Sequence, residues 1–216
     1  MKMASNSVGT VSVLGVNLLE PTLELIERLE AAPAVEPNEV QAGPLENGLS
    51  CGIVTLTALL LESAINRTRY IRREICDDDI VDYFVKVTSE RELGKDIDEV
   101  IAIRDAVVHN HLWEADVYWG EDRRLRFKTP PNLLEGFGNK RQRRVMDPKT
   151  RQSRRLGLNL YPLRIWRVDA YTSLRVVARA LEALEAKDRN YFYISRHPFE
   201  FRGGTSTLRQ VIDTLP

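Results

Sequence analysis

The longest periodic hydrophobic pattern runs from Leu49 to Ile75. Apolar residues recur there at three- and four-residue steps, and no proline interrupts them. This spacing places the apolar side chains on one face of a helix. The pattern therefore predicts one long core helix, whose buried stripe contains Ile53, Leu56, Leu60, Ala64, Ile71 and Ile75.

The same period predicts further helices on both sides of this one. After the long helix, two helices are predicted on either side of an expected turn around Gly94. Aspartate is favoured at helix N-caps, and residues 77–79 offer three aspartates in a row. The predicted helices are Glu20 to Ala32, a helix from the 77–79 cap through Val87, Asp96 to about Leu112, and Val168 to Lys187.

After Trp113 the hydrophobic period changes to two, which is typical of strands. Val117 and Trp119 form one alternating run and Leu125 and Phe127 another, with Gly120-Glu121-Asp122 between them. This arrangement predicts a short β-hairpin. Residues 129–156 are expected to form a long basic loop, and Leu158, Leu160, Leu163 and Ile165 a strand that returns to the hairpin.

These patterns predict a mainly α fold with a small β insertion, and 216 residues with 43% hydrophobic content suit one main domain. Residues 1–47 are interpreted as an acidic N-terminal arm and linker. Residues 48–190 form the predicted helical domain, with a basic insert at about 116–166. Residues 191–216 are expected to be a tail that packs on the core, with a turn at Gly203-Gly204.

The formal net charge is zero, but the charges are segregated along the chain. Residues 1–50 hold two basic groups and seven glutamates, whereas residues 121–167 hold fourteen basic and four acidic groups. Such a cationic segment can contact a phosphate backbone. The alternative is a solvated loop that balances the acidic arm. The predicted RNA contacts are Lys140, Arg141, Arg143, Arg144, Lys149, Arg151, Arg154 and Arg155.

The cysteine content and the apolar segments indicate a cytoplasmic protein. Only Cys51 and Cys76 are present, so no disulfide framework is expected, and neither has a partner at metal-ligand spacing. We expect no signal peptide, no membrane span, no metal and no cofactor.

The strongest chemical candidate is the segment from Arg104 to His111, at the end of a predicted core helix. Histidine exchanges protons near neutral pH, and arginine grips a phosphate with two hydrogen bonds. Asp105 lies one helical turn before His109, so it can orient or charge the imidazole. Arg104 and His109 lie about 140° apart around the helix axis. A joint site therefore requires either that the arginine stem wraps or that a second copy of the helix completes the site.

The segment Arg104-Asp105-Ala106-Val107-Val108-His109-Asn110 resembles the signature of the HEPN family, in which an arginine precedes a histidine near the end of a bundle helix. The resemblance extends to Leu61-Glu62-Ser63 upstream and Leu158-Asn159-Leu160 downstream, and covers roughly residues 48–187. It implies a four- to five-helix bundle that dimerises along the motif helices. Many such proteins are metal-independent endoribonucleases of toxin, antiphage or RNA-processing systems. In these enzymes the RNA 2′-hydroxyl attacks the adjacent phosphate and leaves a cyclic phosphate end.

The resemblance also implies roles for individual residues. His109 would be the general acid or base, Arg104 would stabilise the charge of the phosphorane, and Asp105 would hold the motif in register. Asp105 departs from the asparagine that is more frequent at that place. His111 fits the signature as a second reading, and Asn110 and Glu62 are further secondary candidates.

Two functional alternatives stay open at this point. Some members of the family are inactive modules that bind RNA or a protein, so an antitoxin or other regulatory protein is an alternative partner. Either histidine is also consistent with an ordinary surface or core imidazole.

Overall fold

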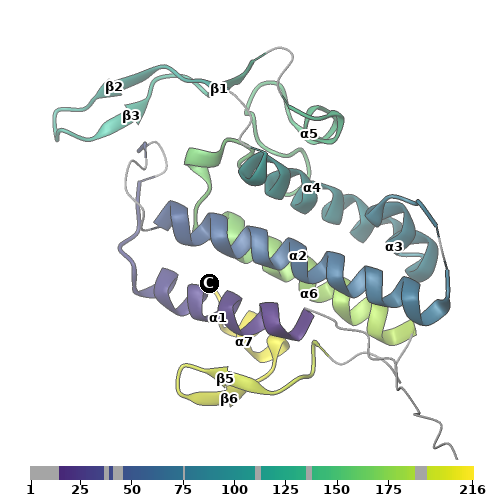
Figure 1. Ribbon diagram of the computed structural model, residues 1–216. Helices are drawn as coiled ribbons and strands as arrows, with labels where there is room; N and C mark the ends of the chain where they lie inside the picture. The colour runs from purple at the N-terminus through teal and green to yellow at the C-terminus, as the bar shows by residue number, and fades with distance from the viewer. Residues whose placement is uncertain are drawn as a thin grey trace, which may run out of the picture.

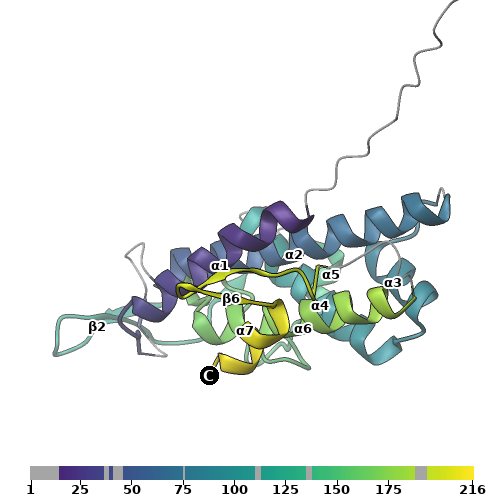
Figure 2. The same cartoon turned by 90° about the horizontal axis from the view of Figure 1, so that it is seen from below.

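The computed structural model describes residues 15–36, 39–40, 46–74, 76–109, 113–134, 138–187 and 194–216. Within these ranges the fold is mainly helical with a few small antiparallel strand pairs, as predicted. The central helix is α2 (Glu46–Arg72), which lies between α1 (Gly15–Ala31) and α4 (Arg91–Val108). Behind α2 packs α6 (Arg167–Lys187), and α3 (Ile80–Thr88) packs against α4 and α6 (Figure 1). Seen from below, α6 again lies on one side of α1 and α2 (Figure 2).

The helix α1 belongs to the hydrophobic core and is not an appended arm. Its side chains at helical spacing, Leu19, Leu23, Ile26 and Leu29, are buried against α2. The Pro- and Gly-rich composition of residues 33–48 favoured a separate arm, but the helix before this stretch packs on the core. Buried apolar area drives this packing.

The helix α2 is long and apolar enough, by length and composition, to cross a membrane. Half of the window that meets this test is buried inside the protein, and α2 contacts α1, α4 and α6. Its first residue, Glu46, accepts hydrogen bonds from the Val35 backbone and from Arg167 at the start of α6. These features are those of the central helix of a bundle.

The insert between α4 and α6 carries most of the small elements. The predicted hairpin is present as β2 (Val117–Trp119) and β3 (Leu125–Phe127). Within the expected loop lie β4 (Asn132–Leu133), which pairs with β1 (Trp113–Glu114), and the short helix α5 (Lys140–Val145). The predicted strand over 158–165 is wrong, because this stretch contains an isolated bridge at Asn159 and a 3₁₀ turn, η1 (Pro162–Arg164).

The C-terminal residues form a hairpin and a helix against the bundle. The hairpin pairs β5 (Phe199–Phe201) with β6 (Gly204–Ser206), and Gly203 takes a positive φ in the turn between them. Phe199 and Phe201 are buried, and α7 (Leu208–Thr214) packs on α6.

Gly94 lies inside α4, not in the predicted turn. The turn between α3 and α4 lies earlier, at Ser89, which adopts a left-handed conformation. A Cβ atom at position 94 would overlap Cγ2 of Val85 on α3. Glycine is therefore required by the close approach of the two helices.

We expect Gly94→Ala to destabilise the protein, because overpacking costs about 1–3 kcal/mol and exceeds the gain of about 1 kcal/mol in helix propensity. In a Val85→Ala background the overlap is removed, so the same substitution should become stabilising. Urea denaturation of the single and double variants measures both signs. A Gly94→Ala effect of equal sign and size in both backgrounds would contradict this account of the helix contact.

Asp169, in the first turn of α6, is a buried carboxylate. It accepts hydrogen bonds from the backbone N–H groups of Asn159 and Trp166 and from the Asn159 amide. These bonds favour the charged form, but the loss of solvent outweighs them, and burial raises the pKa of Asp169 to about 6.

As the pH falls from about 6 to about 4, Asp169 should therefore take up a proton in the folded protein, whereas the same carboxyl group stays ionised in the unfolded chain. The free energy of unfolding contributed by this group falls as the pH rises through that window, by up to roughly 3 kcal/mol. In urea denaturation, the stability of wild type relative to Asp169→Asn should therefore be higher at low pH than at pH 7. A relative stability that is constant, or that rises with pH, would refute the assignment.

Candidate functional site

The Arg104–His109 motif lies at the C-terminal end of α4. His109 is the C-cap residue, and its backbone N–H donates to the Asp105 carbonyl at 3.0 Å. The His109 side chain is 56% exposed, whereas that of Asp105 is 8% exposed. The imidazole therefore lies at the surface, above a carboxylate embedded in the protein.

One carboxylate oxygen joins the motif residues within a single chain. Asp105 Oδ1 lies 3.1 Å from Arg104 Nη1 and 4.0 Å from His109 Nε2. The Arg104 stem thus bends around the helix toward the face that carries Asp105 and His109. A wrapping arginine stem was one of the two geometries that a joint site allowed. Arg104 and His109 approach the same anionic oxygen despite their separation around the helix axis.

Glu62 on α2 is the second carboxylate that holds Arg104. The two side chains form a close ion pair, and both are largely buried. The Arg104 Nε atom is buried without a hydrogen-bond partner. Two carboxylates thus neutralise the guanidinium and fix it between α2 and α4.

The other Asp105 oxygen faces the insert. Oδ2 accepts a hydrogen bond from Asn139 Nδ2 at 2.7 Å, and Arg141 Nη1 lies 3.8 Å away. Sequence reasoning did not find Asn139. Its only local signal is that of an N-cap residue before a short helix, which says nothing of a partner 34 positions earlier.

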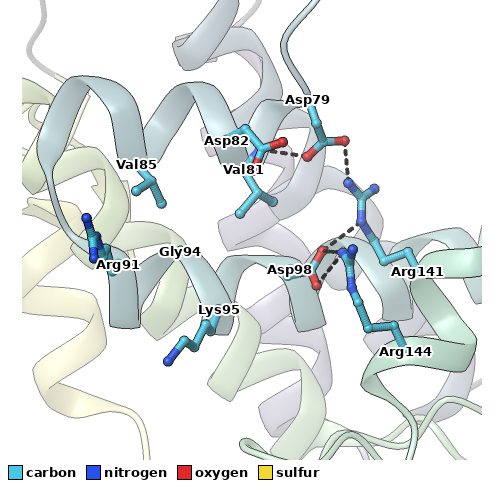
Figure 3. A pocket seen from close by; sticks show the side chains of 10 residues that line it. All are labelled: Asp79, Val81, Asp82, Val85, Arg91, Gly94, Lys95, Asp98, Arg141 and Arg144. Atoms are coloured by element: carbon cyan, nitrogen blue, oxygen red, sulfur yellow. Dashed lines mark hydrogen bonds and ion pairs between the residues drawn. The ribbon is translucent and has the colours of Figure 1, made fainter.

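The basic insert is folded against α4 through ion pairs, which corrects the expectation of a long loop. Arg141 Nε lies 2.9 Å from Asp98 Oδ1, and its Nη2 reaches Asp79, the N-cap of α3 (Figure 3). Arg144 pairs with the same Asp98, and Arg155 with Asp96 at 2.9 Å. Burial lowers the pKa of Arg141, but the two carboxylates more than offset this and raise it. These basic side chains of the insert are thus paired with carboxylates of α3 and α4.

The eight predicted RNA contacts therefore differ in their surroundings. Arg141, Arg144 and Arg155 are paired with carboxylates of α3 or α4. Arg151 donates to Asn132 Oδ1 and Arg154 to the Met146 carbonyl, both neutral acceptors. Of the five predicted contacts other than these three arginines, Lys140, Arg143, Lys149 and Arg154 are exposed and Arg151 is partly buried.

A pocket of about 490 Å³ lies where α3, α4 and α5 meet. Arg91 and Lys95 lie on one side of it, and Asp98 with Arg141 and Arg144 on the other (Figure 3). Arg141 also approaches Asp105, so the pocket and the motif share one guanidinium. The remaining lining residues are Asp79, Val81, Asp82, Val85 and Gly94.

The hairpin β2–β3 extends away from the bundle (Figure 1). It presents large side chains to solvent. Val117 and Tyr118 are exposed, and Trp119 is 71% exposed. On β3, Phe127 is buried and packs edge-on against Tyr161 at 5.5 Å between ring centroids, which anchors the hairpin to the protein.

Two of the secondary candidates, Asn110 and His111, lie outside the described residues. In the part of the chain that the structure describes, no three His, Cys, Asp or Glu side chains are placed to hold a metal ion. Cys51 and Cys76 are free thiols, and burial raises the pKa of Cys51 to about 12.

Comparisons of the chain with protein-family models, with curated proteins and with solved structures found no match.

Glu99, in the middle of α4, is a buried carboxylate that sequence reasoning also missed. It accepts hydrogen bonds from Ser153 Oγ at 2.7 Å, from the Arg155 N–H at 2.9 Å and from the Leu156 N–H at 2.8 Å. These three bonds satisfy polar groups that the 153–156 turn directs at the helix. Glu99 is therefore the buried anchor of the insert.

We expect Glu99→Gln to loosen this turn, because the new amide group must face hydrogen-bond donors. Bonds to a charged acceptor contribute about 1.5–3 kcal/mol, so exchange of the Arg155 and Leu156 amide hydrogens should accelerate by about ten- to a hundredfold. The control is Glu92→Gln, which alters only the surface ion pairs of Glu92 with Arg155 and Lys95. Unchanged exchange in Glu99→Gln would show that the turn is held by other contacts.

Proposed function

We propose that the protein is a metal-independent endoribonuclease of the HEPN type that acts as a homodimer. The observation that carries this proposal is the Asp105 carboxylate oxygen that lies beside both Arg104 and the exposed His109. A solvent-accessible imidazole next to a buried carboxylate and a guanidinium is suited to proton transfer at a phosphodiester.

His109 acts in cleavage as the group that exchanges protons. A base removes the proton of the RNA 2′-hydroxyl, the oxygen attacks the adjacent phosphorus, and an acid donates a proton to the departing 5′-oxygen. The products are a 2′,3′-cyclic phosphate and a 5′-hydroxyl. Two proton transfers need two groups, and a second copy of His109 across a dimer supplies the second. Each transfer contributes typically 10²- to 10⁴-fold in rate.

Arg104 stabilises the charge that develops on the phosphorane. Its guanidinium has five N–H groups, so contact with Glu62 and Asp105 leaves donors for a phosphate oxygen. Val108, exposed in the last turn of α4, provides an apolar contact for a second copy at the same helix end. Lys140, Arg143, Lys149 and Arg154 supply exposed positive charge for the RNA backbone.

A catalytically silent binding module is the alternative, and a specific observation favours it. Glu62 and Asp105 both hold Arg104, which reduces its capacity to bind a phosphate. The exposed strand Val117–Trp119 would in that case contact a protein partner such as an antitoxin or another regulatory protein. For the nuclease, a toxin or antiphage role is part of the proposal.

We expect wild-type protein to cleave total cellular RNA or a labelled tRNA pool in the presence of EDTA, leaving cyclic phosphate ends. His109→Ala and Arg104→Ala should each lower the rate by at least about a hundredfold. The matched control is His197→Ala, which removes an imidazole next to the C-terminal hairpin, outside the motif. All variants are compared after circular dichroism and urea denaturation show that they are folded.

Two outcomes would count against the nuclease. Cleavage that survives in His109→Ala would exclude the proposed role of the imidazole. Intact RNA with every protein, together with RNA binding that weakens steeply as salt rises, would assign the chain to the binding modules.

A further inference from the structure

Asn139 holds the Asp105 carboxylate from outside the motif helix. Its Nδ2 donates to Asp105 Oδ2 at 2.7 Å, and its Oδ1 accepts the Gln142 backbone N–H at 2.7 Å. One amide side chain therefore caps α5 and at the same time binds the carboxylate beside His109. This contact joins the insert to the motif.

The orientation of a carboxylate is fixed when both of its oxygens are held. On one side, Asp105 Oδ1 faces Arg104 and His109 of its own helix. On the other side, Oδ2 faces Asn139 and, at a longer distance of 3.8 Å, Arg141. From α2, Glu62 reaches this group only through Arg104. The neutral amide is the partner at hydrogen-bond distance on the Oδ2 side.

We propose that Asn139 is a positioning residue that sets the direction of the Asp105 carboxylate toward His109. The effect of Asn139 on RNA cleavage rests on the proposed function, whereas its contact with Asp105 does not. Without the amide donor, Asp105 turns toward the Arg141 guanidinium, the remaining cation on the Oδ2 side. The carboxylate charge beside the His109 ring then changes its position.

Two substitutions separate this role from helix capping. Asn139→Ser keeps an oxygen that can cap α5, because serine, aspartate and asparagine cap helices about equally well. It replaces the Nδ2 donor to Asp105 with a shorter side chain, whose single hydroxyl occupies the cap. Asn139→Asp also keeps the cap but directs a second carboxylate at Asp105 Oδ2. The control is Asn132→Ser in the same insert, since Asn132 contacts Arg151 and not Asp105.

The first readout does not depend on RNA cleavage. In NMR spectra at fixed pH, the His109 ring resonances should move in Asn139→Ser and in Asn139→Asp, and should stay in place in Asn132→Ser. The Asn139 side-chain amide resonance should move in Asp105→Ala. Ring resonances of His109 that are unchanged in both Asn139 variants would overturn the proposal.

The second readout is the split between kcat and KM. Asn139→Ser should lower kcat by about ten- to a hundredfold with KM unchanged, since misplacement of a catalytic group by about 1 Å has effects of this size. Asn139→Ser combined with Asp105→Ala should be no slower than Asp105→Ala alone. Additive losses, or a change confined to KM, would contradict the positioning role.

The two readouts distinguish the failure of this inference from failure of the nuclease. If wild type cleaves no RNA but the His109 ring moves in the Asn139 variants, the proposed function fails and the positioning contact stands. If wild type cleaves RNA and Asn139→Ser retains its kcat and its His109 spectrum, the nuclease stands and the positioning role is wrong.

Discussion

The pairing of the α4 carboxylates with the basic insert is the interaction on which the rest of the structure depends. The carboxylates of Asp96, Asp98, Glu99 and Asp105 all bind groups from the stretch 139–156. These carboxylates lie dozens of positions before the groups that they bind. Buried acidic groups along a helix would be costly without partners. The insert supplies the counterions and hydrogen-bond donors.

These pairs differ in what they contribute to stability. Arg144 is 67% exposed, so its bond to Asp98 is screened by water and salt and contributes little. Glu99 is buried with three hydrogen-bond donors, and bonds to a charged acceptor contribute about 1.5–3 kcal/mol. The buried contacts therefore fix the position of the insert, while the surface pairs can exchange partners. Asn139 and Arg141 transmit that fixed position to the carboxylate beside His109.

Sequence periodicity predicted the elements well, because helix and hairpin patterns are local properties. The spacing of Val117, Trp119, Leu125 and Phe127 predicted the hairpin, and the Asp79 cap marked the start of α3. The turn predicted at Gly94 is wrong, because sequence alone does not distinguish a glycine required by helix contact from a glycine in a turn. In the site, the spacing of Asp105 and His109 indicated their proximity, whereas Glu62, Glu99 and Asn139 depend on contacts 34 to 57 positions away, which no local pattern encodes.

The different surroundings of the basic residues have a consequence for any polyanion that approaches the insert. A phosphate backbone that engaged Arg141 would have to displace Asp79 and Asp98, and would pull on the Asp105 contact at the same time. Engagement of Lys140 or Lys149 requires no such displacement, because both side chains are exposed. Binding through these lysines therefore leaves α5 seated on α4, and the geometry around His109 is preserved while the polyanion is held. Binding of a polyanion through Arg141 would instead change the orientation of Asp105. This arginine is therefore the residue through which ligand contact at the insert and the arrangement of the motif are physically linked.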